Sequence, residues 1–284
     1  MLDIFKPLPV ADRRANLAAY HQFLIERDGV MDVEKRLLSR REERMAKYER
    51  PLSRVRDMDR DLFAGQYKAF NPKVETPPEM LLLIALVKIN GAEAFGVNQS
   101  FDKVLRRAVK NDDMCELMLL IEETYHTRIL LSTSLSYGVE VKSAYEPPAS
   151  LRTLISAIGL SPLVIARPLT LAAEVLAVLL FLNLLEKTRV VLKHDPELRD
   201  AVEERLCEII TDEIGHMSYN RQCMGAWGIA QAKVLLPLVA MGLSGAFPDV
   251  KALGAMSAAS DSEVQSLATG SRLPAQVMRS AFIS

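Results

Sequence analysis

The sequence is poor in cysteine and carries no excess of either charge. Its 284 residues include 3 cysteines, and Cys115, Cys207 and Cys223 form no Cys-x-x-Cys pair. This spacing excludes a disulfide framework, so a reducing cytoplasm is the simplest compartment. The formal net charge of -1 lacks the basic excess expected of a dedicated nucleic-acid-binding protein. The N-terminal residues also lack an apolar core of signal-peptide length, so we expect no secretion.

Long apolar runs are few, and two of them raise the question of a membrane span. Residues 168–185 are long enough to cross a bilayer, but they contain Glu174. A carboxylate at the centre of a bilayer costs about 2.5 kcal/mol or more. Residues 229–247 contain Lys233 and Pro237. We therefore predict no stable membrane span, and we interpret 168–185 as a helix buried inside a bundle.

Alternation of apolar and polar residues is scarce, and helical spacing dominates, which predicts an all-α protein. Residues 11–64 are dense in charge of both signs, with Pro51 as a break, and are typical of two or three solvated helices. Turn and capping signals predict further helices at about 78–95, 112–137, 162–192, 196–222 and 227–243.

We interpret residues 1–284 as a single domain. Residues 1–70 would form charged helices packed on the outside, and residues 78–222 a core of four long helices. Residues 223–257 would add a C-terminal helix. Residues 258–284 are rich in Ser and Ala, and we expect this tail to be poorly ordered.

Two helices carry the same pattern of an acid, a glutamate, two further residues and a histidine, as EETYH and DEIGH. Residues three apart lie on one helix face, so Glu123 and His126 can bind one metal ion together. The same holds for Glu213 and His216. Carboxylate oxygen combined with imidazole nitrogen suits iron or manganese. Bundles that use two such pairs take one further glutamate from each of the two remaining helices.

Glu174 is the first candidate for these additional glutamates. The turn at residues 194–195 lies about 18 residues before Glu213, and counting as far back along the preceding helix ends near residue 176. An antiparallel pair of helices therefore places Glu174 level with Glu213. A buried carboxylate among apolar neighbours also needs a partner.

Glu93 is the second candidate, because it lies in an apolar helix upstream of the turn at Asn111. The count is less symmetrical here, since Glu123 follows the turn by only about 12 residues. Gly96 can change the local geometry, and Asp102 is the alternative ligand. Glu75 and Glu79 lie at the helix start, where they are typical of capping charges.

The acids beside the two ligand glutamates, Glu122 and Asp212, suggest a supporting role. A histidine that binds a metal needs an acceptor for its other ring nitrogen. An acid next to each ligand glutamate could reach the histidine of the opposite motif. The alternative is that both acids are ordinary surface charges.

The complete set resembles the site of the ferritin-like di-iron oxygenases. Its six residues are Glu93, Glu123, His126, Glu174, Glu213 and His216. Within this group, the chain is most similar to the p-aminobenzoate N-oxygenase family. The similarity lies in the chain length, the EETYH and DEIGH motifs and the charged N-terminal helices. The resemblance implies a ferritin-like four-helix bundle with additional N-terminal and C-terminal helices.

The resemblance also implies an activity. Enzymes of that family use two iron ions (Fe2+/Fe3+) and O2 to oxidise amines, typically arylamines, to hydroxylamines and nitro groups in natural-product biosynthesis. An external electron donor, a ferredoxin or a reductase, would be a partner, and a mixed Mn/Fe pair fits the same donors. The alternatives are C–H hydroxylation, desaturation or aldehyde deformylation on the same bundle, an interfacial quinol oxidase, and iron storage.

The chain departs from the family at one position, where Ile209 replaces a further ligating histidine. Either His194 supplies a seventh ligand or the site has six. We expect an apolar lining that includes Leu119, Leu130, Val178, Phe181 and Met217. Arg128, Arg167 and Asn98 are nearby polar residues, and the sequence assigns none of them to a substrate. Large apolar helix faces are compatible with a homodimer.

Overall fold

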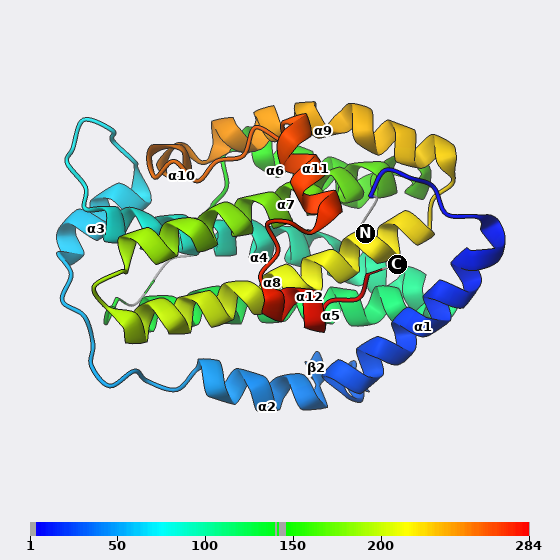
Figure 1. Ribbon diagram of the computed structural model, residues 1–284, viewed down its shortest axis with the longest axis horizontal. Coiled ribbons are helices and arrows are strands. Elements are labelled where there is room, and N and C mark those ends of the chain that lie inside the picture. Colours follow the sequence, from blue (N-terminus) through cyan, green and yellow to red (C-terminus); the bar gives the residue numbers. More distant parts are fainter. Residues whose placement is uncertain (1–3, 140, 142–145, 284) are drawn as a thin grey trace.

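Four long helices lie side by side along the longest axis of the molecule (Figure 1). The computed structural model describes residues 4–139, 141 and 146–283, and this part of the chain is predominantly helical, which confirms the all-α class. The four helices are α4 (Pro78–Asn111), α5 (Met114–Leu135), α7 (Leu163–Val191) and α8 (Pro196–Gln222). Each contacts two of the others, in the pairs α4–α5, α7–α8, α5–α8 and α4–α7.

Local capping sets where two of these helices begin. The Asp195 side chain accepts a hydrogen bond from the backbone N–H of Leu198 at 3.1 Å, and Pro196 occupies the first turn, as predicted. At the other junction Asp112 ends α4 in the left-handed conformation, with φ of 54°. The N-cap of α5 is therefore Asp113, one residue later than the predicted start, and it accepts from the N–H of Glu116.

Helix α4 continues well beyond residue 95, where the sequence predicted its end. Gly91 and Gly96 lie inside it, and a glycine costs about 1 kcal/mol relative to alanine in a helix interior. The prediction gave that cost too much weight, because α4 packs against α5, α6 and α7, and this packing outweighs it.

Helix α6 (Ala149–Leu160) was not predicted from the sequence. It follows Pro147 and Pro148 and contacts α4, α7 and α9. Helix α9 (Ala226–Ala246) packs along α7, and the short α10 (Pro248–Ala252) reaches back to α4. A buried ion pair between Lys88 and Asp249, 3.1 Å long, joins α10 to α4.

The N-terminal region forms three helices, as predicted: α1 (Val10–Asp28), α2 (Ser39–Tyr48) and α3 (Arg60–Lys68). Between α1 and α2 lies a two-stranded antiparallel hairpin of β1 (Met31–Asp32) and β2 (Leu37–Leu38), in which Met31 pairs with Leu38. Helix α1 contacts α5 and α8, and α2 contacts α5. Figure 1 shows α1 and α2 on one side of the long helices and α9 on the opposite side.

The tail after Ser257 differs from the expectation of poor order. It contains α11 (Asp261–Thr269) and α12 (Ala275–Ser280), which contact α7 and α8 respectively. Ser260 and Glu263 form a capping box at the start of α11. Leu267 and Val277 are fully buried, so a single apolar anchor fixes each short helix despite the polar composition.

Three helices, α4, α7 and α9, are long and apolar enough to cross a membrane by length and composition. The sequence had raised the question of a membrane span only for the segments that form α7 and α9. In α4 and α7 most of the apolar window is buried inside the protein. In α9 only 33% of it is buried, and Trp227, Val234, Leu238 and Met241 are exposed.

Candidate metal centre

The four long helices bring all six sequence-derived ligand candidates into one region. Ligand atoms of Glu123, Glu174, Glu213 and His216 lie within 4.8 Å of one another. A second group, formed by Glu93, His126 and Glu213, meets the same limit. Glu213 belongs to both groups, so the two clusters are adjacent and share a carboxylate.

The unequal count from the turn did not keep Glu93 away from this site. Glu93 meets His126 rather than Glu123, and His126 lies three residues further along α5. Three residues rise about 4.5 Å along a helix, which offsets part of the difference. Asp102, the alternative ligand, is exposed on α4 and joins neither group.

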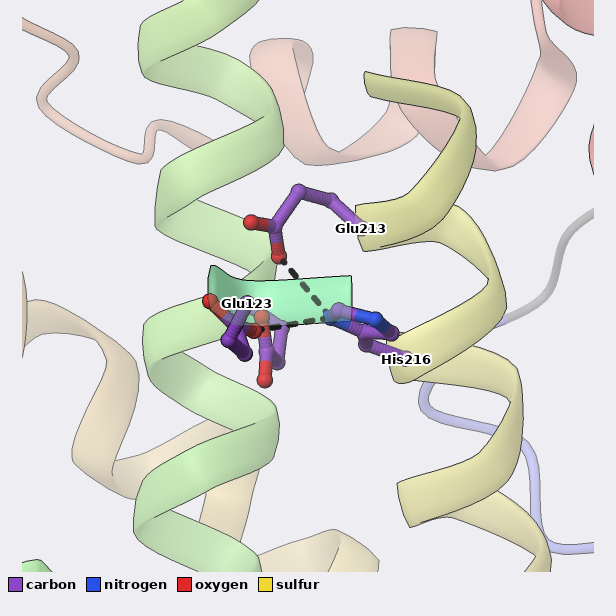
Figure 2. Close-up of side chains that lie close together, drawn as sticks. Glu123, Glu213 and His216 are labelled. Carbon is purple, nitrogen blue, oxygen red and sulfur yellow. Dashed lines mark ion pairs between the residues drawn. The ribbon is translucent and has the colours of Figure 1, made fainter. Parts of the chain in front are cut away.

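Glu123 and Glu213 both lie between the two imidazoles. The Nδ1 atom of His216 is 3.0 Å from Glu123 Oε1 and 3.7 Å from Glu213 Oε2. The Nδ1 atom of His126 is 3.4 Å from an oxygen of each of the same two carboxylates. Figure 2 shows Glu213 and His216 leaving one helix, with Glu123 turned toward the His216 ring. Both ring nitrogens therefore face the same two carboxylates.

The unsatisfied atoms at this site fit a pair of cations. Both Nδ1 atoms, together with one oxygen each of Glu93 and Glu213, are buried without a hydrogen-bond partner. Buried polar atoms without partners are costly, and a metal ion would satisfy them. Glu123 and Glu213 pair with the two histidines. Two divalent cations would balance the combined charge of Glu93, Glu123, Glu174 and Glu213.

The pKa values of the buried carboxylates are shifted in opposite directions, according to their neighbours. Burial raises the pKa of Glu93. Burial, the charge of Glu213 and a hydrogen bond to it raise the pKa of Glu174 well above its usual range. At Glu213 burial has the same upward effect, but the hydrogen bond from Glu174 and the contacts with both histidines outweigh it and lower the pKa. A cation beside Glu174 would offset the cost of burying its charge.

The histidines are shifted upward. Burial alone would lower the pKa of His126, but Glu123 and Asp212 outweigh it and raise the pKa well above the ordinary value. The pKa of His216 is raised in the same way by the nearby carboxylates of Glu122, Glu123 and Glu213. Each imidazole is therefore surrounded by carboxylates, an environment that also favours a metal cation.

The outer ring nitrogens contact the two neighbouring acids crosswise, as expected from the sequence. His126 Nε2 lies 2.9 Å from Asp212 Oδ2, and His216 Nε2 lies 3.2 Å from Glu122 Oε2. Glu122 and Asp212 are both buried, which excludes the alternative of ordinary surface charges. Each acid can fix the tautomer in which its histidine presents Nδ1 to the metal site.

Two arginines from the N-terminal region, Arg41 fully buried and Arg27 partly buried, lie behind these acids. Arg41, fully buried on α2, forms an ion pair with Asp212, and its Nη1 also lies 2.9 Å from Glu208. Arg27, on α1, forms an ion pair with Asp212 and lies 3.5 Å from Glu122. Arg27 and Arg41 lower the pKa of Asp212 against the opposing effect of its burial.

Residues 11–64 were expected to form solvated helices, so this layer of paired charges was not predicted. A periodic signal was present, because Arg41 lies four and seven residues before Met45 and Tyr48, and all three are buried on one face of α2. Glu208 lies four residues before Asp212 on α8, which also places the two on one face. The charge density of the region concealed both patterns.

A cavity of about 380 Å³ adjoins the candidate metal centre. Glu93, Glu123, Glu174 and His216 line one part of it. Most of the remaining lining is apolar, and it includes Leu119 and Phe181, as expected. Leu130, Val178 and Met217 do not line it, because they are buried in the surrounding core.

The remaining candidates are accounted for by their positions. His194 is exposed in the turn before α8. The rise of about 1.5 Å per residue places it roughly 27 Å from Glu213 along the axis of α8. It cannot serve as a seventh ligand in this structure, and Ile209 is fully buried in the core. Arg128 pairs with Glu42 and Glu49 on the outer face of α5.

The other polar candidates differ in position. Asn98 is exposed, whereas Arg167 lines the cavity.

No protein-family model, curated protein or solved structure matches this chain.

Proposed function

We propose that this chain is a non-haem di-iron oxygenase built on a ferritin-like four-helix bundle. It would use O2 to oxidise a small organic substrate, and N-oxygenation of an amine is the favoured reaction. The observation that carries the proposal is the pair of adjacent ligand groups, which contain four carboxylates and two imidazoles from four helices. This donor set suits two iron ions, or one manganese and one iron, better than it suits zinc.

The residues would divide the work between binding, orientation and exclusion of water. Glu93, Glu123, Glu174 and Glu213 would hold the two ions together with His126 and His216. Glu122 and Asp212 would orient the two imidazoles. Bound iron would supply the activation of O2 after reduction by an external donor. The apolar cavity beside the ligands would admit an organic substrate and keep bulk water away.

Metal content after anaerobic loading with Fe(II) tests the metal centre. We expect about two ions per chain, and Glu174→Gln should lose at least one of them. Glu186→Gln is the matched control on the same helix, because Glu186 is exposed and pairs with Arg272. The proposal would be refuted if the wild type and Glu174→Gln both fold but neither binds metal.

Oxygen consumption then tests the reaction. With a chemical reductant and 4-aminobenzoate, we expect O2 uptake coupled to formation of the hydroxylamine or nitro product. Uptake that is coupled instead to hydroxylation, desaturation or deformylation of another probe would keep the di-iron centre and replace the N-oxygenase assignment.

The exposed apolar face of α9 favours one further candidate, an interfacial quinol oxidase. That reaction would require attachment to a lipid surface through the face that carries Trp227, Val234, Leu238 and Met241. Co-flotation of the protein with lipid vesicles, together with quinol-dependent O2 uptake, would support this candidate. A protein that oxidises amines but neither floats with vesicles nor consumes O2 with quinol would exclude the quinol oxidase.

A further inference from the structure

The cavity beside the candidate metal centre has a polar end as well as a metal end. Arg167 and Glu174 both line it from α7, and they lie seven residues apart on that helix. Seven residues make two turns, so the two positions share one helix face and are separated by about 10 Å along the axis. On α5 the cavity residues Glu116 and Glu123 have the same separation.

The space between the two ends is lined by small and apolar side chains. Gly96 and Val97 contribute from α4, Leu119 from α5, and Thr170 and Ala173 from α7. The lining provides room for an apolar body, such as a ring or a short chain, and few polar partners along its length. The volume of about 380 Å³ fits a molecule of modest size.

Two arginines line the polar end, and only one of them has an anionic partner. Arg107 forms a forked pair with Glu116, with Nε 3.0 and 3.1 Å from the two carboxylate oxygens. Arg167 donates one hydrogen bond, to the backbone carbonyl of Cys223 at 3.3 Å, and its Cζ lies 5.8 Å from the Tyr219 ring centroid. Within the described residues no carboxylate forms an ion pair with Arg167.

The nearby acids are engaged elsewhere. Glu116 is held by Arg107, and Asp113 accepts a hydrogen bond from the Tyr219 hydroxyl at 2.7 Å. The Arg167 guanidinium thus retains most of its five N–H donors for a partner inside the cavity. A planar guanidinium binds a carboxylate through two parallel hydrogen bonds.

We infer that Arg167 is a specificity-determining residue that binds the carboxylate of an elongated, mainly apolar substrate whose reacting end lies at the metal centre. A single unpaired cation matches a monoanion, whereas a phosphate dianion would keep one charge without a partner. The inference deepens the proposed function and rests on it for the reaction at the metal end. Binding of the carboxylate itself depends only on Arg167 and the cavity.

The test compares two probes of the same shape, 4-phenylbutyrate and 4-phenylbutyramide, by calorimetric titration of the full-length protein. Titrations are made on the Mn(II)-loaded protein and on the chelator-treated protein, in which no metal can bind the carboxylate. We expect the wild type to prefer the carboxylate by about tenfold to a hundredfold. Arg167→Gln should abolish the preference, and Arg167→Lys should keep part of it.

Arg128→Gln is the matched control, because Arg128 pairs with Glu42 and Glu49 on the outer face of α5. It should leave the preference unchanged. The inference fails if the wild type shows no preference, or if Arg167→Gln keeps the wild-type ratio. A preference that appears only with Mn(II) and survives Arg167→Gln would assign the carboxylate to the metal and also overturn it.

The outcome is separable from that of the proposed function. Loss of discrimination in Arg167→Gln with no bound metal would keep the carboxylate site and reject the di-iron centre. Bound metal with unchanged discrimination would keep the centre and reject the role of Arg167.

Discussion

The imidazole Nε2 of His126 lies 2.9 Å from the Oδ2 atom of Asp212, so the acid beside one motif contacts the histidine of the other. The reciprocal contact joins His216 to Glu122. These two contacts link α5 to α8 at the level of the candidate metal centre. The orientation of each histidine is therefore set by the helix opposite to its own.

Replacement of Glu122 by glutamine should weaken metal binding without removing a ligand. The amide still fills the space but is a weaker acceptor for His216, so we expect affinity to fall by about tenfold to a hundredfold. Competition with a chelator measures the change. Glu122 is preferable to Asp212 here, because Asp212 also forms ion pairs with Arg27 and Arg41. Wild-type affinity in Glu122→Gln would show that this acid has no influence on the metal.

Replacement of Arg41 by glutamine should destabilise the fold. Arg41 is fully buried between Asp212 and Glu208. Its loss removes a positive charge that balances the negative charges of these two carboxylates. Breaking a buried pair of this kind costs about 3–5 kcal/mol of unfolding free energy. Urea unfolding measures it, and Arg128→Gln, which breaks an exposed pair, should cost less than about 1 kcal/mol. Equal losses in the two variants would contradict the structural role of Arg41.

The ion pair between Arg56 and Asp195 predicts a pH dependence of stability. Hydrogen bonds from Arg56 lower the pKa of Asp195 well below its usual value, and hydrogen bonds from Ser53 lower the pKa of Glu197 to about 2. Because these folded-state pKa values are depressed, the stabilisation is fully present above the unfolded-state pKa of about 4. It is lost as the pH falls from there through the folded-state values.

Unfolding free energies measured between pH 6 and pH 2 check this prediction. The stability difference between wild type and Arg56→Gln should be constant above about pH 5 and shrink at lower pH. A difference that stays the same throughout the range would mean that Arg56 does not act through the charge of Asp195.

Replacement of Gly96 by leucine should fill the cavity and leave the metal centre intact. A Cβ atom at Gly96 would meet only Ile155, at an ordinary contact distance of 3.6 Å, so a larger side chain can extend into the cavity. We expect wild-type metal content and loss of 4-phenylbutyrate binding in calorimetry. Gly65→Leu is the control, since Gly65 is helical and open to space. Unchanged binding in Gly96→Leu would place the ligand elsewhere.

Much of the architecture could be predicted because helix signals are local. The Asp195–Pro196 start of α8 and the break near Pro51 depend on neighbouring residues alone, and both were predicted. The full length of α4 was not, because it depends on how strongly α5, α6 and α7 pack over its glycines. Helix α6 and the two tail helices likewise depend on the long helices that they contact.

The spacing in Glu123-x-x-His126 and Glu213-x-x-His216 is enough to predict the ligand types of the candidate site, because it places each pair on one helix face. The surroundings of these ligands depend on how the helices pack. Arg27 and Arg41 were expected to be solvated charges, and only the packing of α1 and α2 places them against Asp212, where Arg41 is fully buried. Arg167 likewise became distinct from other arginines only when helix packing gave it a cavity and no anionic partner among the described residues. Burial and charge pairing depend on contacts between distant segments, and local spacing carries no information about them.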